Sequence, residues 1–269
     1  MTRTELLRPE PALALAALLD IPVPDLDQGL PLLWHWIYLL DRPAQTDLGQ
    51  DGHPVRNTVV APPGPGRRRM WAGGRVRTLG PLRCGEPATR HSEVLSLTEK
   101  QGRTGALTIV VVGHEIRQGG RVVVKEEQDI VYRDADSTVP ARGDRGPERP
   151  PADGEWSVAV SPTLLFRFSA LTYNAHRIHY DRGYARDVEG YPGLVVHGPL
   201  QALAMAEIAR TRGRNGDQRF DYRLIEPLFD HQGLVASAAA EGDALTTAVR
   251  DIHGRQTAIG TLRSVENGH

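Results

Sequence analysis

Apolar positions in the first forty residues recur at helical spacing. Residues 6–19 are rich in alanine and leucine and stop at the proline-containing stretch 21–24, which predicts one helix. Residues 32–40 (LLWHWIYLL) are apolar on nearly every side, which predicts a buried helix. Residues 42–69 lose this periodicity and hold many prolines and glycines. They predict a long loop, and loops of this length are usually functional or mobile.

From residue 71 the pattern changes to strands. Gln118-Gly119-Gly120 separates two apolar segments and predicts a hairpin turn, so the sheet is expected to be antiparallel. The predicted strands cover residues 71–79, 92–100, 107–117 and 121–133.

The second half of the chain repeats this order. Residues 134–155 hold four prolines, many charges and little to bury, which predicts a linker. An apolar strand is expected within residues 156–168, and residues 194–210 predict a helix with Pro199 in its first turn. The last predicted strands cover residues 219–227, 233–241, 244–252 and 256–264.

A short internal repeat connects the two halves. Residues 77–82 (RTLGPL) match residues 223–228 (RLIEPL) at an offset of 223 − 77 = 146. Together with the same order of elements, the match favours a duplicated helix-plus-sheet unit of the α+β class. The predicted division is an N-terminal unit at 1–133, a linker at 134–155 and a C-terminal unit at 156–269.

Composition excludes several functional classes. The chain has 32 basic and 33 acidic residues and a net charge of −1, so we expect no bulk attraction to nucleic acid or to an anionic membrane. No segment approaches the roughly 20 apolar residues that cross a bilayer. The single Cys84 excludes an internal disulfide framework and a thiolate zinc cluster. These features predict a cytoplasmic protein.

Two polar segments could carry chemistry. Residues 169–184 (SALTYNAHRIHYDRGY) hold Asn174, His176 and His179, and residues 191–201 (YPGLVVHGPLQ) hold His197 and Gly198. Two histidines on one helix are most often a solvated face, and an HxxH spacing binds a metal only with further ligands. The sequence supplies no cysteine or carboxylate pair beside them, so no metal site is predicted.

These segments resemble the MaoC-like, R-specific enoyl-thioester hydratases of the hotdog superfamily. The resemblance extends to hydroxyacyl-thioester dehydratase type 2, a double-hotdog branch that includes mesaconyl-CoA and itaconyl-CoA hydratases. This branch also carries segments like residues 32–41 (LLWHWIYLLD), 49–54 (GQDGHP) and 68–76 (RRMWAGGRV), so the resemblance spans about residues 7–263. It implies a double hotdog, in which each unit is a long helix wrapped by an antiparallel sheet.

The family signature D-x-N-P-[LIV]-H falls on residues 174–179, where Asn174 replaces the aspartate. The resemblance implies that His179 transfers the proton, that Asn174 holds the water or hydroxyl, and that His176 helps. An imidazole with a pKa near 6.5 suits acid and base roles near neutral pH. Gly198, at the helix N-terminus, can offer its N–H to an enolate oxygen. His197 is either a structural cap or a contact to the acyl tunnel.

The function implied is a hydro-lyase that reversibly hydrates a trans-2-enoyl thioester or dehydrates an (R)-3-hydroxyacyl thioester without a cofactor. Arg67, Arg68 and Arg69 are either a solvated turn or a basic lip for the phosphates of coenzyme A or of an acyl-carrier protein. A homodimer is possible. Two alternatives stay open: a hotdog thioesterase, for which Glu207 is the nearest carboxylate, and a non-catalytic acyl-thioester-binding subunit.

Overall fold

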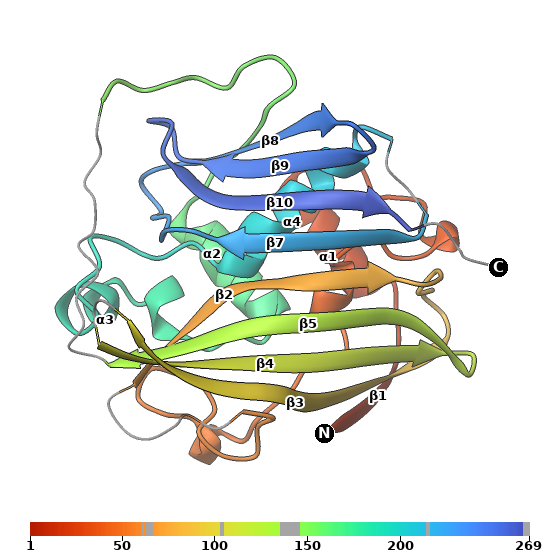
Figure 1. The fold of residues 1–269 in the computed structure, drawn as a ribbon, viewed down its shortest axis with the longest axis horizontal. Coiled ribbons are helices and arrows are strands. Elements are labelled where there is room, and N and C mark those ends of the chain that lie inside the picture. The colour runs from red at the N-terminus through yellow and green to blue at the C-terminus, as the bar shows by residue number, and fades with distance from the viewer. Residues whose placement is uncertain (61, 63–66, 103–104, 135–145, 214–215, 266–269) are drawn as a thin grey trace.

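The computed structural model describes residues 1–60, 62, 67–102, 105–134, 146–213 and 216–265. In these ranges ten strands form one antiparallel sheet in the order β1-β3-β4-β5-β2-β7-β10-β9-β8-β6 (Figure 1). The strands are β1 (Thr2–Leu6), β2 (Arg67–Thr78), β3 (Pro87–Gly102), β4 (Gly105–Gln118), β5 (Arg121–Asp134), β6 (Trp156–Val158), β7 (Gln218–Leu224), β8 (Leu234–Glu241), β9 (Ala244–Arg250) and β10 (Gln256–Ser264). The α-helices are α1 (Glu10–Leu19), α2 (Pro162–Leu171), α3 (Arg182–Asp187) and α4 (Gly198–Arg210).

The two halves of the sheet meet where β2 pairs with β7. Arg75 pairs with Asp221, and these residues are separated by the offset of the sequence repeat, 221 − 75 = 146. Gly73 pairs with Arg223, and Arg77 pairs with Arg219. Arg219 is the repeat equivalent of Gly73 and Arg223 that of Arg77, so the pairing is symmetric about the Arg75–Asp221 pair. The sheet therefore has the two related halves that the repeat predicts. The predicted unit boundaries stay predictions, because residues 135–145 of the linker lie outside the described ranges.

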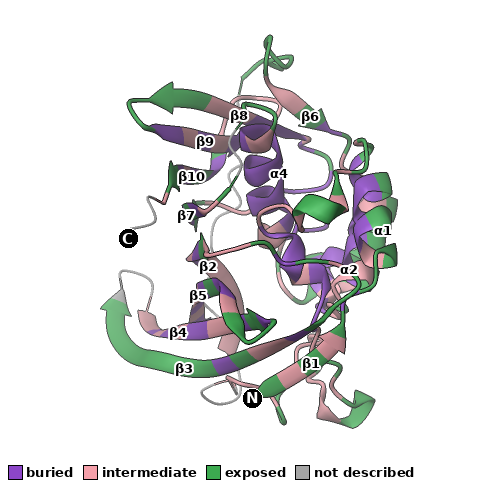
Figure 2. Cartoon of the chain, turned by 90° about the vertical axis from the view of Figure 1, so that its right-hand side faces the viewer, coloured by how far each residue is buried: buried purple, intermediate pink, exposed green. Residues whose placement is uncertain are grey.

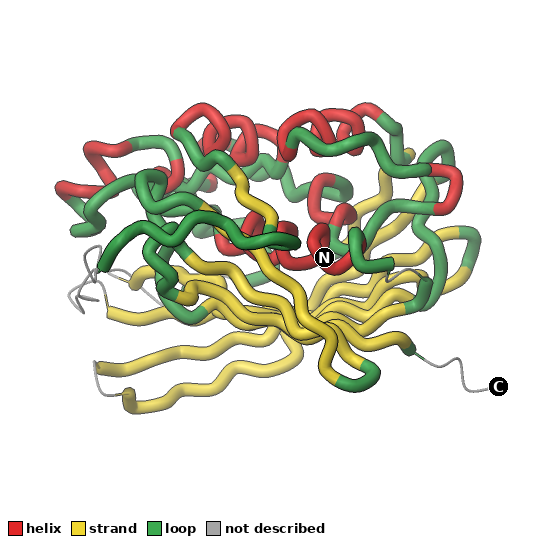
Figure 3. The backbone as a smooth tube through the Cα atoms, turned by 90° about the horizontal axis from the view of Figure 1, so that it is seen from above, coloured by secondary structure: helices red, strands yellow, loops and turns green. Residues whose placement is uncertain are grey.

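The helices cover one face of the sheet, which curves around them (Figures 2 and 3). The central one is α4, which packs against β8, β9 and β10. Residues 200–209 of this helix are all buried, and Pro199 lies in its first turn, where the missing N–H has no intrahelical partner to lose. No helix in the described ranges is long and apolar enough to span a bilayer.

The buried helix predicted for residues 32–40 is wrong. Only a short 3₁₀-helix, Trp34–Ile37, forms there, between Leu33 (φ 69°) and Leu39 (φ 53°) in left-handed conformations. The burial was predicted correctly, since Trp34 is fully buried. The indole N–H of Trp34 donates to Glu207 Oε1 (2.7 Å), and that tertiary contact holds this short segment against α4.

Two further predictions about elements need correction. The segment before Asn174 is mainly the helix α2, not a strand, and Ser161 caps it by accepting a hydrogen bond from the N–H of Leu164 (3.1 Å). The first predicted helix is shorter than expected, because residues 2–6 form the edge strand β1 and α1 begins only at Glu10, between Pro9 and Pro11.

Candidate active site

The HRIH segment follows α2 through a tight turn. Tyr173 takes a left-handed conformation (φ 51°), and Asn174 Oδ1 accepts a hydrogen bond from the N–H of His176 (3.0 Å). A 3₁₀-helix, Arg177–His179, follows. The Asn174 oxygen therefore holds the turn, whereas its amide nitrogen has no partner among the described residues and remains available to a ligand.

His179 is fixed in one tautomer. Its Nδ1 lies 2.7 Å from the carbonyl oxygen of Val195, which can only accept, so Nδ1 carries the proton and Nε2 is the basic nitrogen. Burial lowers the pKa of His179 to about 4, although the bond to Val195 acts in the opposite direction. The imidazole is therefore neutral near pH 7 and able to act as a base.

His197 lies against His179 at the start of α4. The two rings are stacked, with centroids 3.6 Å apart and an interplanar angle of 20°. His197 makes no side-chain cap to α4; its Nε2 lies 2.8 Å from Ser169 Oγ, and its buried Nδ1 has no partner among the described residues. Burial lowers the pKa of His197 well below its ordinary value. It supports the ring of His179.

Gly198 provides the first N–H of α4, and this N–H has no acceptor in the described part of the chain. A Cβ at this position would lie 2.2 Å from Leu224 Cδ1, so any larger residue would have to displace the leucine side chain or the start of α4. The helix N-terminus thus offers an unused donor beside the paired rings of His179 and His197.

A cavity of about 590 Å³ lies between the two halves of the chain. Asn174, Ser169 and Pro199 line it, and they neighbour His179 and Gly198, which do not themselves line it. The N-terminal half contributes further polar and aromatic groups: His35, Trp36, His53, Arg69, Arg90, His114, Glu126 and Gln128. Of the predicted site residues, Asn174 and Arg69 therefore line one cavity built by both halves, whereas His179 and Gly198 adjoin its lining.

Asp51 and His53 belong to the site but were not predicted. His53 Nδ1 lies 3.1 Å from Asp51 Oδ2, and the His53 ring packs on that of His176 with centroids 4.0 Å apart. The rings of His176 and His179 follow at 5.3 Å. His53, His176, His179 and His197 thus form a continuous histidine row. Burial lowers the pKa of both His53 and His176.

The 146-residue offset of the internal repeat could have pointed to this loop as a site segment. Since 198 − 52 = 146, Gly52 corresponds to Gly198 of the C-terminal half. In the described part of residues 52–64 the N-terminal half has no helix that would correspond to α4. Gly52 and His53 line the cavity there instead.

One group of donor atoms lies close enough together to hold a metal ion. The atoms of Asp51, His53 and His176 are within 4.8 Å of one another. The Asp51 carboxylate is already used inside the group, because its two oxygens accept hydrogen bonds from Nδ1 and from the backbone N–H of His53. That the site needs no metal stays a prediction.

The three predicted arginines contact different partners. They lie in β2 itself rather than in a turn before it. Arg68 pairs with Glu189 (Nε–Oε2 3.0 Å), and Arg67 donates to the carbonyl oxygen of Ala106 (3.3 Å). Of the three, Arg69 lines the cavity, with its Nη1 atom 3.4 Å from His53 Nε2.

Glu126 anchors another side of the cavity. Its carboxylate accepts hydrogen bonds from Trp36 Nε1 (2.8 Å) and Gln128 Nε2 (2.8 Å) and lies 3.0 Å from His35 Nε2. Burial alone would raise the pKa of Glu126, but the hydrogen bond and charge of His35 outweigh it and lower the value to about 2. This ionised, fully hydrogen-bonded group serves to hold residues 35 and 36 on the sheet.

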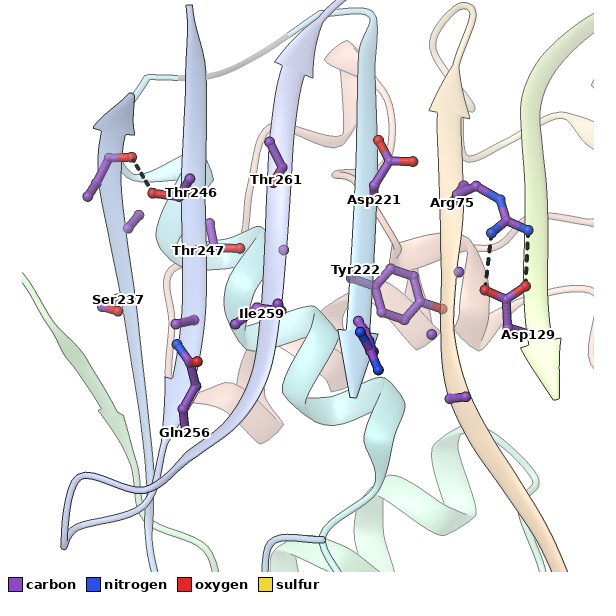
Figure 4. A pocket seen from close by; sticks show the side chains of 18 of the residues that line it. Arg75, Asp129, Asp221, Tyr222, Ser237, Thr246, Thr247, Gln256, Ile259 and Thr261 are labelled. Carbon is purple, nitrogen blue, oxygen red and sulfur yellow. Dashed lines mark hydrogen bonds and ion pairs between the residues drawn. The ribbon is translucent and has the colours of Figure 1, made fainter. Parts of the chain in front are cut away.

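A second hollow, of about 860 Å³, lies on the face of the sheet away from the helices (Figure 4). Its lining has no histidine, and Arg75 is paired with Asp129 (3.0 Å) and Glu127 (2.8 Å). It therefore lacks the imidazole groups that occur in and beside the cavity of Asn174.

Comparisons with known proteins identify the family of the chain. Residues 33–230 match the family model of hydroxyacyl-thioester dehydratase type 2. Mesaconyl-C(4)-CoA hydratase of Chloroflexus aurantiacus is 48% identical over 238 residues, which cover 87% of this chain and 84% of that protein. The mitochondrial hydroxyacyl-thioester dehydratase type 2 of Schizosaccharomyces pombe is 40% identical over 82 residues, 29% of this chain and 27% of that protein.

Solved structures show the same fold. HtdX of Mycobacterium tuberculosis has a TM-score of 0.67 at 16% identity, covering 98% of this chain and 100% of that one. A MaoC-like dehydratase from Phytophthora capsici also has a TM-score of 0.67, at 17% identity, covering 100% of this chain and 96% of that one. These neighbours confirm the predicted double hotdog. From the family match and the 48% identity, the chain belongs to the hydroxyacyl-thioester dehydratase type 2 family and is a hydro-lyase.

Proposed function

We propose that the protein reversibly adds water to the C2=C3 bond of a trans-2-enoyl-CoA thioester, giving the (R)-3-hydroxyacyl thioester. The observation that carries the proposal is the tautomer of His179, whose Nδ1–H is bound to Val195 so that Nε2 can accept. The unused N–H of Gly198 at the start of α4 supports it.

The reaction needs a held water, a base that takes one water proton and delivers it to C2, and a donor for the enolate oxygen. Nε2 of His179 accepts a hydrogen bond from the water, and the free amide N–H of Asn174 donates to the water oxygen. As the oxygen bonds to C3, the electron pair of C2=C3 moves toward the thioester carbonyl. The N–H of Gly198 donates to that oxygen, where removal of such a donor typically costs about 3 kcal/mol of barrier.

The test is the ultraviolet absorbance of the conjugated enoyl thioester. Purified protein should lower this absorbance to an equilibrium value with crotonyl-CoA or with an enoyl-CoA that carries a carboxylate, and it should form the 3-hydroxyacyl-CoA. Release of free thiol, or an unchanged absorbance with every enoyl-CoA tried, would contradict the proposal.

The acyl group that we propose carries a carboxylate, as the name of the Chloroflexus relative describes for its substrate. Arg69 supports this choice, because it lines the cavity and has no carboxylate partner in the described ranges. A guanidinium can bind a carboxylate through two N–H groups, and such charged bonds contribute about 1.5–3 kcal/mol.

Replacement of Arg69 by Gln should raise KM for mesaconyl-C(4)-CoA by about 10- to 100-fold. The KM for crotonyl-CoA, which has no carboxylate, should change by less than about twofold, because Arg69 has no anion to bind there. Arg69 also contacts His53 Nε2 (3.4 Å), so a change in kcat through that contact should be shared by both substrates. The exposed Arg77 of the same strand provides the matched control, Arg77→Gln. Equal rises in KM with both substrates would contradict carboxylate recognition by Arg69.

The thioesterase alternative has less support. The Glu207 carboxylate accepts hydrogen bonds from Trp34 Nε1 (2.7 Å) and from Arg210 Nη2 (2.7 Å), and the residue is 2% exposed. It does not line the cavity that holds Asn174. A carrier-protein substrate, the homodimer and the cytoplasmic location stay predictions.

A further inference from the structure

We propose that Asp51 and His53 form a second catalytic pair of this site, in which His53 carries the proton between the water and C2 of the acyl group. This inference rests on the proposed hydration reaction and assigns a step within it. The pair comes from the N-terminal half, so the reaction would need residues of both halves.

The loop that carries the pair is fixed to the HRIH segment. Gly52 has φ +89°, and a Cβ there would lie 1.8 Å from the carbonyl oxygen of Ala175, so the two backbones are in direct contact. Arg177 donates its backbone N–H to Asp51 O (2.8 Å) and its Nη1–H to Gln50 O (3.1 Å). The position of His53 relative to the HRIH segment is thus set by backbone contacts rather than by a free loop.

The carboxylate of Asp51 sets the tautomer of His53. Its Oδ2 accepts from Nδ1–H (3.1 Å) and its Oδ1 from the backbone N–H of His53 (2.9 Å). Burial raises the pKa of Asp51, but the hydrogen bonds from His53 outweigh it and lower the value, so the carboxylate is ionised. His53 Nε2 is then the acceptor; it lies 3.4 Å from Arg69 Nη1, in a side chain that lines the cavity with Asn174. A base oriented by a third group in this way is the arrangement of acid–base dyads and triads.

Within the histidine row, His53 is best suited to carry a positive charge. Its Nδ1–H faces a carboxylate, whereas that of His179 faces a neutral carbonyl and His197 contacts the hydroxyl of Ser169. Burial and the charge of Arg69, from β2, lower the pKa of His53, and the hydrogen bond and charge of Asp51 partly counteract them. The pair therefore supplies the titratable group that Asn174 cannot.

The proposed step is balanced without another reactant. In hydration the water oxygen bonds to C3 as one water proton passes to His53 Nε2, and the C2=C3 pair moves into the thioester carbonyl. The His53 imidazolium then gives that proton to C2, using the enolate pair, and the carbonyl re-forms. The other water proton stays on the new hydroxyl, held by Nε2 of His179. Dehydration is the reverse, with neutral His53 taking the C2 proton.

The test is steady-state hydration by the full chain with mesaconyl-C(4)-CoA and crotonyl-CoA. His53→Gln should lower kcat by about 100-fold or more with KM changed by less than about twofold, and Asp51→Asn should lower kcat by about 10-fold. The matched control is Gln50→Ala, because Gln50 is exposed and contributes only its backbone oxygen to the contact. His53→Ala should regain rate with added imidazole, which a merely structural role would not produce.

Three results would overturn the inference. One is a His53→Gln rate within about threefold of wild type. Another is His53→Ala that is inactive at every imidazole concentration while its melting temperature is unchanged. The third is wild-type activity that is lost on chelation and restored by a divalent ion, because Asp51, His53 and His176 would then act on a metal. Wild type that hydrates neither substrate would instead contradict the proposed function.

Discussion

The Nδ1–H of His179 donates to the carbonyl oxygen of Val195 at 2.7 Å, and Val195 lies three residues before the first residue of α4. This bond fixes the imidazole to the segment that also presents the N–H of Gly198. The carbonyl of Val195 and the N–H of Gly198 belong to one short segment. A change at Gly198 is therefore expected to shift the ring of His179 as well.

The stability of the protein should fall as pH falls below about 6.5. The folded-state pKa of His179 is about 4, below its ordinary value of 6.5, so the unfolded chain binds more protons in this interval. Between pH 7 and pH 5 this group alone should reduce the free energy of unfolding by about 2 kcal/mol. Urea unfolding at both pH values measures the change, and His179→Gln should make the loss smaller. A pH-independent free energy of unfolding would contradict the buried, neutral state.

Activity should depend on pH in the same direction. The neutral imidazoles are the active forms, and burial lowers the pKa of both His53 and His179. The logarithm of kcat/KM should therefore rise with pH only below 6.5 and stay level through pH 7. Asp51 raises the pKa of His53, so the Asp51→Asn substitution should lower it. The increase of kcat/KM with pH should therefore occur at lower pH in this variant than in wild type. A kcat/KM that falls with pH between 6 and 8 would require a protonated histidine and contradict this prediction.

Gly198→Ala should lower both stability and rate. The added Cβ would lie 2.2 Å from Leu224 Cδ1, so the start of α4 or the leucine must move. We expect a loss of about 1–3 kcal/mol in the free energy of unfolding, typical of overpacking, and a lower kcat as the N–H shifts. The double variant Gly198→Ala, Leu224→Ala removes the clash and should recover part of the rate. If the double variant is slower than Gly198→Ala, the clash is not the cause.

Glu207→Gln should affect stability rather than catalysis. The substitution removes a buried charge that accepts bonds from Trp34 and Arg210, at a cost of about 1–3 kcal/mol. Hydration should stay within about twofold of wild type, because Glu207 does not line the cavity. Thermal unfolding and the enoyl assay measure the two effects. A thioesterase activity that is present in wild type and lost in Glu207→Gln would support the rival hydrolytic function.

Much of the fold could be predicted because its pattern is local. The hairpin between β4 and β5 follows from Gly119 and Gly120, and the short repeat at an offset of 146 residues predicted two related units. The helix predicted over residues 32–40 failed for the opposite reason. Trp34 bonds to Glu207 of α4 and Trp36 to Glu126 of β5, and such distant partners leave no periodic signal.

The candidate site was predictable only in part. His179, His197 and Gly198 lie in two adjoining motifs, and the resemblance assigned them to one site. Asp51 and His53 lie in residues 49–54, for which the sequence predicted no catalytic role. The contact of this segment with residues 175–177 is tertiary and leaves no local pattern. The sequence also could not predict which way the side chains of Arg67, Arg68 and Arg69 point, because their directions depend on where β2 begins.

The central claim is that Nε2 of His179 holds and orients the water that adds to C3. The most direct measurement is kcat for hydration by His179→Ala, with His179→Gln as a variant that fills more of the buried space and the melting temperature as the check on folding. The account predicts that both variants unfold cooperatively and lose at least about 100-fold in kcat, the loss expected when a reacting group is no longer positioned. A folded His179→Ala that keeps the wild-type rate would contradict it.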